Sequence, residues 1–448
     1  MSFTKASEKV KNSKYIEKYP FLPFLRFVKQ ERKFNPKKYG KDIRYKSKDR
    51  EISYASHKDG YIYSYYAKIL NDAYENLLKK YQLDTNILAF RKIKKKNSES
   101  GKSSIEFAND VFNQIKDFGE CSVLAMDFSK FFNTLNHQLL KEQWSKVLGV
   151  DKLPEDHFKV FKSLTNFSFI DRDKIYCKLG ISRNNPRPKD KNRKSICKVE
   201  KLRELIKEDK SISDKSKRLL QTNKESKGIP QGSALSGLLS NIYMINFDKQ
   251  VKEYIENMQG KYYRYCDDII IITKLGDVDK VDNFITNNFV KDLETVEINK
   301  DKTEKFHFYN GKILGNKFLQ YLGFIFDGQN IYLRSSSISR YYRKMNRGIK
   351  LAKRTQIARN RIRTKKNLQN RELYKNRIYE RYSSLGNRNF ISYVKRAIKI
   401  MDNSQTLKKQ MQKFQKAFDT KMSLQVKSPI KGGKPTQNIF CKKILKNR

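Results

Sequence analysis

Cysteine is scarce in this chain of 448 residues, and the five cysteines are scattered without a Cys-x-x-Cys pair. That spacing argues against a zinc module and fits a reducing cytoplasm. No apolar run approaches the length that crosses a bilayer. The first residues also lack the charged-then-apolar layout of a signal peptide. We therefore expect a cytoplasmic protein with no membrane partner.

Acidic residues are also in short supply, with 47 Asp and Glu against 97 Lys and Arg, a formal charge of +50. Such a chain repels itself unless a polyanion shares its surface, and nucleic acid is the natural partner. A membrane surface or a lysine-favouring genome would give a similar balance. The excess peaks over 340–400, with twenty basic residues, two acids and helical spacing. This pattern predicts a helical region that contacts phosphates, although a solvated helical face has a similar composition.

Apolar periodicity predicts a short strand followed by a helix over 51–78, and a further helix over 103–118. The apolar stretch 122–126 predicts a buried strand that ends at Asp127. The polar segment 183–193 has no periodicity and reads as an exposed loop.

Two features carry carboxylates at predicted strand ends. Asp127 is followed by Phe128 and a turn, and a single Asp in this place is usually a helix cap. In Lys261-Tyr-Tyr-Arg-Tyr-Cys-Asp-Asp-Ile-Ile-Ile-Ile-Thr273 two β-prone runs meet at Asp267 and Asp268, which predicts a hairpin with paired acids at its tip. Adjacent carboxylates repel each other, and a bound Mg²⁺ would relieve that repulsion. Asp127 could complete a two-metal site.

A glycine-bearing turn lies between these two features, in Lys227-Gly-Ile-Pro-Gln-Gly-Ser233, and leads into an apolar helix. Gly232 permits a tight turn with close backbone approach, and the side chain of Gln231 can hydrogen-bond a nucleotide or template. An ordinary junction between a loop and a helix is the alternative.

In this order the three segments resemble the palm motifs of reverse transcriptases, over roughly 46–324 with the helical region behind. The resemblance implies an α+β right-hand polymerase with fingers, a palm built on an antiparallel sheet, and an α-helical thumb. We expect an amino-terminal extension and fingers in 1–118 and a palm in 119–333, with a polar insertion around 141–226. A basic helical thumb in 334–426 and a flexible tail in 427–448 complete the expected order.

The resemblance also implies roles for individual residues. It makes Asp127, Asp267 and Asp268 catalytic, and it places two Mg²⁺ ions at these three residues and Phe128. Phe132 matches the residue that lies under the sugar and excludes a 2′-hydroxyl, which favours deoxynucleotides over RNA synthesis; a core phenylalanine is the alternative. The other residues that match nucleotide-binding positions are Lys48, Arg50, Arg91, Gln231, Gly232 and Lys302, and those that match the primer grip are Tyr321, Leu322 and Gly323.

Two positions depart from the usual motifs: Cys266 replaces an alanine, and Gly237 stands where many relatives carry proline. No ribonuclease H, His-Asn-His endonuclease or integrase segment follows. Segments 54–66 and 373–393 resemble bacterial antiviral reverse transcriptases, which are related to retron and group II intron enzymes. The implied function is RNA-directed DNA synthesis in antiphage defence. The implied partners are a noncoding RNA template, deoxynucleoside triphosphates, the DNA product, and a second protein or a homo-oligomer. A non-catalytic RNA-binding scaffold and a retron or group II intron-type enzyme remain alternatives.

Overall fold

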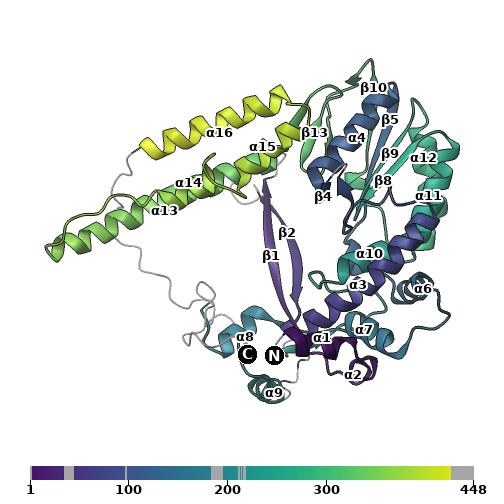
Figure 1. The fold of residues 1–448 in the computed structure, drawn as a ribbon, viewed down its shortest axis with the longest axis horizontal. Helices are drawn as coiled ribbons and strands as arrows, with labels where there is room; N and C mark the ends of the chain where they lie inside the picture. Colours follow the sequence, from purple (N-terminus) through teal and green to yellow (C-terminus); the bar gives the residue numbers. More distant parts are fainter. Residues whose placement is uncertain are drawn as a thin grey trace.

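The computed structural model describes residues 3–34, 45–95, 98–182, 195–209, 212, 214 and 218–424. It is an α+β protein with the fingers, palm and thumb of a right-hand polymerase (Figure 1). The loop predicted over 183–193 and the tail predicted over 427–448 lie outside the described residues. Within the described ranges, no helix combines the length and the apolar character needed to cross a membrane.

The palm is a five-stranded antiparallel sheet in the order β11-β10-β5-β9-β8. Strand β5, at its centre, is the buried strand that the apolar stretch before Asp127 predicts. The predicted acidic hairpin is also present, as β8 and β9. The strand bounds are Cys121–Asp127 (β5), Lys261–Tyr265 (β8), Asp268–Lys274 (β9), Glu304–Tyr309 (β10) and Lys312–Ile313 (β11).

The unbroken isoleucine run of β9 follows from burial of both faces of the sheet. Side chains alternate along a strand, and Ile269 and Ile271 join one hydrophobic cluster while Ile270 and Ile272 join the other. Helix α4 (Ser104–Phe118) packs into the second cluster, and α10 (Ser236–Tyr243) and α11 (Ile245–Asn257) pack into the first. The sheet that ends at the acids is therefore held rigidly between helices.

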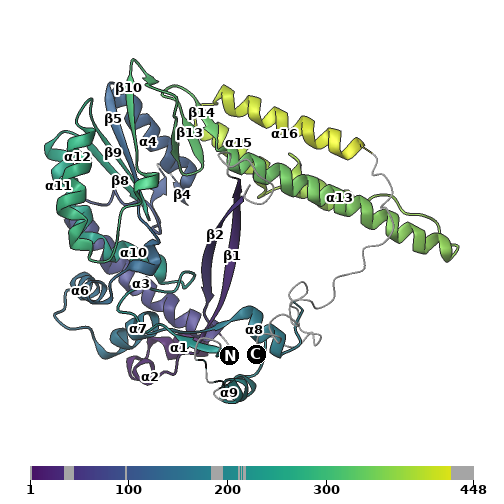
Figure 2. The ribbon, with the colours of Figure 1, turned by 180° about the vertical axis from the view of Figure 1, so that it is seen from behind.

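The fingers are built on a second sheet, in the order β2-β1-β6-β7. Strands β1 (Phe24–Phe34) and β2 (Tyr45–Tyr54) form a long ribbon that rises from helix α3 (His57–Lys80), as both views show (Figures 1 and 2). Strands β6 (Ser168–Asp171) and β7 (Leu220–Thr222) come from the polar section of the sequence and extend this sheet. That section thus supplies strands to the fingers. The domain division expected from the sequence stays a prediction.

The thumb is an arm of helices that extends away from the palm (Figures 1 and 2). Its longest helix, α13 (Ser335–Lys365), lies beside α16 (Gln405–Ser423). The buried ammonium group of Lys353 donates hydrogen bonds to the backbone carbonyls of Lys421, Met422 and Leu424 at the end of α16. This contact satisfies carbonyls that the helix leaves open. Helix α15 (Phe390–Ile400) packs against palm helix α4, and α14 (Asn376–Tyr382) contacts both α13 and α15.

Short elements connect these parts. Before β5 they are α1 (Phe3–Lys11), α2 (Ser13–Glu17), β3 (Lys94–Lys95) and β4 (Ser98–Gly101). Between β5 and α10 they are α5 (Phe131–Thr134), α6 (His137–Leu148), α7 (Glu155–Thr165), α8 (Arg172–Lys178) and α9 (Val199–Glu208). After β9 they are α12 (Val278–Phe284), η3 (Ile285–Phe289), η4 (Lys291–Leu293), η5 (Lys300–Lys302), β12 (Leu319–Tyr321), β13 (Phe324–Phe326) and β14 (Ile331–Leu333).

Candidate active site

The acids that the sequence singles out meet at one end of the palm sheet. Asp127, the last residue of β5, is the register partner of Asp268, the first residue of β9. Paired residues on adjacent antiparallel strands have Cα atoms about 4.5–5.5 Å apart. The amide of Phe128 donates to the carbonyl of Asp267 at 3.4 Å, so the chain after β5 stays against the hairpin tip.

The hairpin tip is a two-residue turn made by Cys266 and Asp267, since Tyr265 pairs with Asp268. Cys266 has a φ of 61° and is buried. A positive φ at the first central residue is the geometry of a type II′ turn, which continues the twist of the strands. Asp267 is half-buried and Asp268 is exposed, so both residues lie at the solvent-accessible end of the sheet, where the strands stop.

The carboxylate of Asp127 is buried and has two different neighbours. One oxygen forms an ion pair with the Lys302 ammonium group. The other, Oδ1, is buried and has no hydrogen-bond partner within the described part of the chain. A bound cation would satisfy that oxygen, and carboxylates are ligands that Mg²⁺ prefers. The donors fit, although no three His, Cys, Asp or Glu side chains in the described ranges already lie close enough together to hold a metal ion.

A buried ion pair that sequence reasoning missed supports the hairpin from behind. Arg264 on β8 donates to both carboxylate oxygens of Asp248 on α11, at 2.7 and 2.5 Å. The same guanidinium donates to the side-chain oxygen of Asn241 and to the carbonyl of Cys266, both at 3.1 Å. The Tyr262 hydroxyl donates to Asp248 at 2.6 Å. Arg264 therefore holds the Cys266 end of the turn against two palm helices.

The Pro-Gln-Gly turn is fastened to the fingers and to the segment after β5. The Ser53 amide donates to the carbonyl of Gln231 at 2.8 Å. Gly232 has a φ of 120°, and a Cβ there would lie 2.8 Å from the Ser53 carbonyl oxygen, so a side chain is excluded. His137 Nε2 donates to the carbonyl of Gly228 at 2.8 Å. The Gln231 side chain is half-buried and makes no hydrogen bond within the described residues, which leaves its amide available.

The two phenylalanines after Asp127 have different surroundings. Phe131 is 3% exposed and packs against Phe128 in the core. Phe132 is half-buried and meets Phe131 edge to face. Its backbone carbonyl accepts a hydrogen bond from the amide of Ile229 at 2.9 Å. Phe132 thus lies between the acidic strand and the Pro-Gln-Gly turn, where a residue beside the sugar is expected.

The nucleotide-binding residues predicted in the fingers differ in their surroundings. Arg50 on β2 is exposed and makes no ion pair within the described residues, whereas the side chain of Lys48 lies outside them. Arg91 is buried, with hydrogen bonds to both carboxylate oxygens of Glu75 and to the carbonyls of Asp84 and Ile87. These contacts hold the Arg91 guanidinium within the fold, and its contact with template or nucleotide stays a prediction.

The predicted primer-grip segment forms a hairpin between β12 and β13. Leu322 and Gly323 make the turn, with φ values of 45° and 95°. Tyr321 is buried; burial first, and then the nearby Asp268 carboxylate, raise the pKa of its hydroxyl. Tyr321 packs in the same hydrophobic cluster as Ile270 and Ile272 of β9, so this hairpin lies beside the acidic hairpin.

Packing explains why glycine stands at position 237, where many reverse transcriptases carry proline. A Cβ at this position of α10 would lie 2.7 Å from the ring of Phe90. Phe90 itself has a φ of 59° and follows the buried residue Ala89, whose carbonyl accepts a hydrogen bond from Asn241. The ring of Phe90 occupies the space that a proline ring would need.

The basic helices of the thumb offer the clearest surface for a polyanion. Within the described residues after Leu333, no lysine or arginine forms an ion pair with an acid. Surface cations without acidic partners create a positive field that attracts phosphates. The thumb and the acid-bearing end of the palm sheet together have the arrangement of a right-hand polymerase fold.

The comparison with known families agrees with this class. The family model described as "Reverse transcriptase (RNA-dependent DNA polymerase)" matches residues 188–326, which hold the Pro-Gln-Gly turn, the acidic hairpin and the predicted primer grip. This stretch of the chain is therefore similar to the palm of an RNA-directed DNA polymerase. No curated protein is similar enough in sequence to count as a match.

Among solved structures, similarity to telomerases was found. Apo telomerase from Candida tropicalis, truncated from its C-terminal domain, is 14% identical with a TM-score of 0.40, over 68% of this chain and 54% of that one. Telomerase from Candida albicans, in complex with a TWJ fragment of telomeric RNA, is 13% identical with a TM-score of 0.40, over 95% of this chain and 70% of that one. This chain thus spans about half the length of the first of these proteins.

Proposed function

We propose that the protein copies a noncoding RNA into DNA by nucleotidyl transfer at Asp127, Asp267 and Asp268, and that this synthesis serves antiphage defence in a bacterium. The observation that carries the catalytic part is the register pairing of Asp127 with Asp268, directly beside the turn that holds Asp267. Two separate strand ends thereby bring three carboxylates to one edge of a rigid sheet.

The residues around these acids bind the nucleotide and position the template and primer. Gln231 and Gly232 present a side-chain amide and an open backbone to the incoming nucleotide and the template. Phe132 lies under the sugar and excludes a 2′-hydroxyl. Arg50 on the fingers ribbon grips the triphosphate, together with Lys48. The turn formed by Leu322 and Gly323 holds the primer end toward the acids.

Asp127, Asp267 and Asp268, with Phe128 beside them, would hold two Mg²⁺ ions. When bound, the ions supply activation of the primer 3′-hydroxyl and stabilisation of the leaving pyrophosphate. Lys302 already lies on the carboxylate of Asp127. As a cation on a flexible stem, it can turn from that carboxylate to the departing phosphate charge.

The defence role rests on the resemblance of segments 54–66 and 373–393 to bacterial antiviral reverse transcriptases. The first segment includes the start of helix α3, and the second includes α14 and part of α15 at the base of the thumb. Thumb cations that have no acidic partner among the residues the structure describes support stable association with a structured RNA. A second protein or a second copy of the chain completes the proposed set of partners.

Polymerase activity is tested with the purified protein and the RNA that co-purifies with it. Labelled deoxynucleotides are expected to enter a product that ribonuclease shortens and deoxyribonuclease destroys. The double variant Asp267→Ala plus Asp268→Ala should abolish incorporation. Asp151→Ala plus Glu155→Ala removes two exposed acids elsewhere and should retain it. Equal incorporation by wild type and the active-site variant would refute the catalytic assignment.

The template and the biological role are tested separately. Sequencing the co-purifying RNA together with the DNA product should identify one RNA species and its complement. Phage plating on cells that carry wild type or the Asp267→Ala plus Asp268→Ala variant should show protection by wild type alone. Protection by both would favour the alternative of a non-catalytic RNA-binding scaffold, and protection by neither would remove the defence role.

A further inference from the structure

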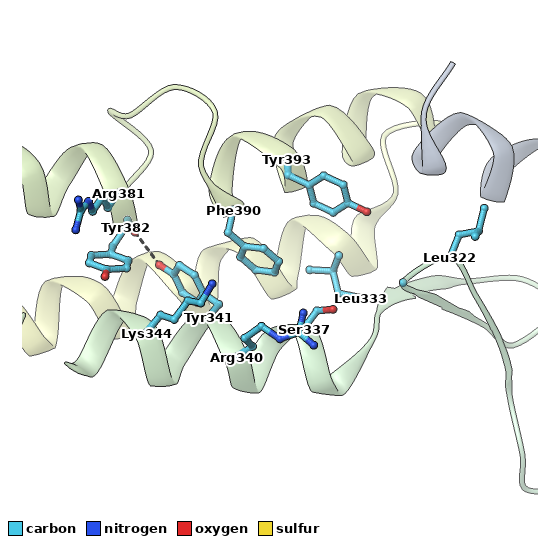
Figure 3. Close-up of a pocket in the computed structure, with 11 residues that line it drawn as sticks. Leu322, Leu333, Ser337, Arg340, Tyr341, Lys344, Arg381, Tyr382, Phe390 and Tyr393 are labelled. Carbon is cyan, nitrogen blue, oxygen red and sulfur yellow. Dashed lines mark hydrogen bonds between the residues drawn. The ribbon is translucent and has the colours of Figure 1, made fainter. Parts of the chain in front are cut away.

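The base of the thumb contains a hollow of about 520 Å³ beside the turn that forms the predicted primer grip (Figure 3). It lies between α13, the end of α14 and the start of α15. Its lining is Leu322, Gly323, Leu333, Ser337, Arg340, Tyr341, Lys344, Arg381, Tyr382, Phe390 and Tyr393. Seven of these eleven residues are aromatic or cationic, a combination that suits an aromatic anion.

The cations of the hollow have no ion-pair partner among the residues that the structure describes. Arg340 and Lys344 stand one helical turn apart on α13 (Figure 3), and Arg381 at the end of α14 is a further lining residue. All three are exposed, and within the described chain none of them makes an ion pair or a hydrogen bond. Three unpaired positive charges around one concave surface repel one another, and a phosphate group would relieve that repulsion.

The positive lining continues past the hollow. An adjoining hollow of about 650 Å³ shares Lys344, Arg381 and Tyr382 with the first. It adds Arg377 and Arg388, with Glu380 as its one acid. When one phosphate of a strand lies in the first hollow, the neighbouring phosphates can therefore contact the cations of the second.

The aromatic side chains form an ordered row. Tyr341 stacks on Phe390 with ring centres 5.0 Å apart, Phe390 stacks on Tyr393 at 6.3 Å, and Tyr393 stacks on Phe324 of β13 at 6.1 Å. Phe390 and Tyr393 are half-buried, so parts of both rings face the hollow (Figure 3). The row is fixed at both ends, by the thumb helix and by the palm. It thus offers a preformed surface on which a flat base can stack.

We propose that this hollow binds one unpaired nucleotide of a nucleic acid strand, with its base against the aromatic row and its phosphate among Arg340, Lys344 and Arg381. Cavities of about 300–1,000 Å³ accommodate small ligands, and an unstacked base is the part of a strand that can enter one. A base paired within a duplex presents only its edges. Stacking tolerates any base, so the site would hold RNA or DNA without reading its sequence.

This inference does not depend on polymerase activity, so it is tested by binding alone in metal-free buffer. The probes are a 5′-phosphorylated trinucleotide with a 3′ fluorophore, as RNA and as DNA, and a short blunt duplex. The charge variant is Arg340→Ala plus Lys344→Ala. Its matched control is Arg343→Ala plus Arg347→Ala, which removes two exposed cations with the same spacing from α13 outside both hollows. Phe390→Leu removes the stacking ring and keeps apolar volume.

We expect the charge variant and Phe390→Leu each to weaken trinucleotide binding by about tenfold, with a loss of less than about twofold in the control. The blunt duplex should respond equally to both double variants. A trinucleotide that carries 4-thiouridine should crosslink to the peptides holding Tyr382, Phe390 or Tyr393. The proposal would be overturned if the two double variants weakened trinucleotide binding equally, or if Phe390→Leu bound the trinucleotide as tightly as wild type. Crosslinks found only in other peptides would also overturn it. Thermal unfolding midpoints check that each variant remains folded.

Discussion

Arg264 and Asp248 form a two-point ion pair in which both side chains are completely buried. Burial alone would lower the pKa of Arg264, but the adjoining carboxylate more than reverses this, so the pKa is raised and the guanidinium stays charged. Since Arg264 also donates to the Cys266 carbonyl, the pair ties the catalytic turn to helix α11. The position of the turn that carries Asp267 thus depends on a buried contact behind the sheet.

Replacing Asp248 with alanine should destabilise the protein strongly, because it leaves the Arg264 guanidinium buried without a counter-charge. Breaking one partner of a buried pair costs about 3–5 kcal/mol. The free energy of unfolding from urea denaturation measures the loss. Lys249→Ala, at the next position of α11 and solvent-exposed, should change it by less than about 0.5 kcal/mol. Similar losses in the two variants would contradict the role given to the pair.

The anchor of the Pro-Gln-Gly turn should make stability depend on pH. Burial lowers the pKa of His137 below its usual 6.5, against the smaller opposing effect of the Gly228 carbonyl. Below about pH 6.5 the unfolded chain therefore binds a proton that the folded protein resists, and stability falls as the pH falls. His137→Gln keeps a donor toward Gly228 but does not titrate.

The free energy of unfolding of His137→Gln should accordingly drop less than that of wild type between about pH 7.5 and about pH 5.5. The pKa of His157 is lowered by burial as well, but its contribution is common to both proteins and cancels in the difference. Parallel pH profiles for wild type and variant would mean that the His137 contact carries no pH-dependent stability.

Phe132 should control the choice of sugar. Truncation to alanine opens space for a 2′-hydroxyl, so incorporation of ribonucleotides relative to deoxynucleotides should rise by roughly tenfold or more. Single-nucleotide extension with each substrate gives the ratio of kcat/KM. Phe131→Leu, in the core beside it, should lower stability without moving that ratio. An unchanged ratio in Phe132→Ala would sink the sugar-gate assignment.

The Lys302–Asp127 ion pair predicts a competition between the lysine and the metal. Because the ammonium group lies on a carboxylate that would hold Mg²⁺, Lys302→Met should raise the affinity of the free protein for Mn²⁺ by about tenfold, as seen by electron paramagnetic resonance. Catalysis should slow at the same time, since the lysine is also proposed to serve the leaving phosphate. Lys300→Met, an exposed lysine of the same short helix, is the control. Unchanged Mn²⁺ affinity in Lys302→Met would remove the competition.

The catalytic segments could be predicted from the sequence because their signals are local. The apolar stretch before Asp127 and the two β-prone runs around Asp267 and Asp268 are long enough to show the strand pattern. The sequence does not predict how these strands pair. The structure shows that Asp127 lies opposite Asp268. The helical thumb was equally visible from its spacing and charge.

The missed features depend on contacts between distant segments. Arg264 sits between tyrosines in a strand and reads as a solvated charge, yet it is buried against Asp248 of the preceding helix. Arg91 reads as a ligand contact, yet Glu75 and two carbonyls surround it. Strands β6 and β7 are four and three residues long, too short for an alternating pattern to identify them.

The most direct test of the central claim is primer extension on a defined RNA template by Asp127→Asn, which keeps the shape of the side chain and removes its charge. Glu253→Gln, on the exposed side of α11, makes the same change away from the site. The account predicts a loss of kcat of at least about 10²-fold in Asp127→Asn and wild-type extension in Glu253→Gln. Extension by Asp127→Asn at the wild-type rate would show that the three acids at the sheet edge are not the polymerase centre.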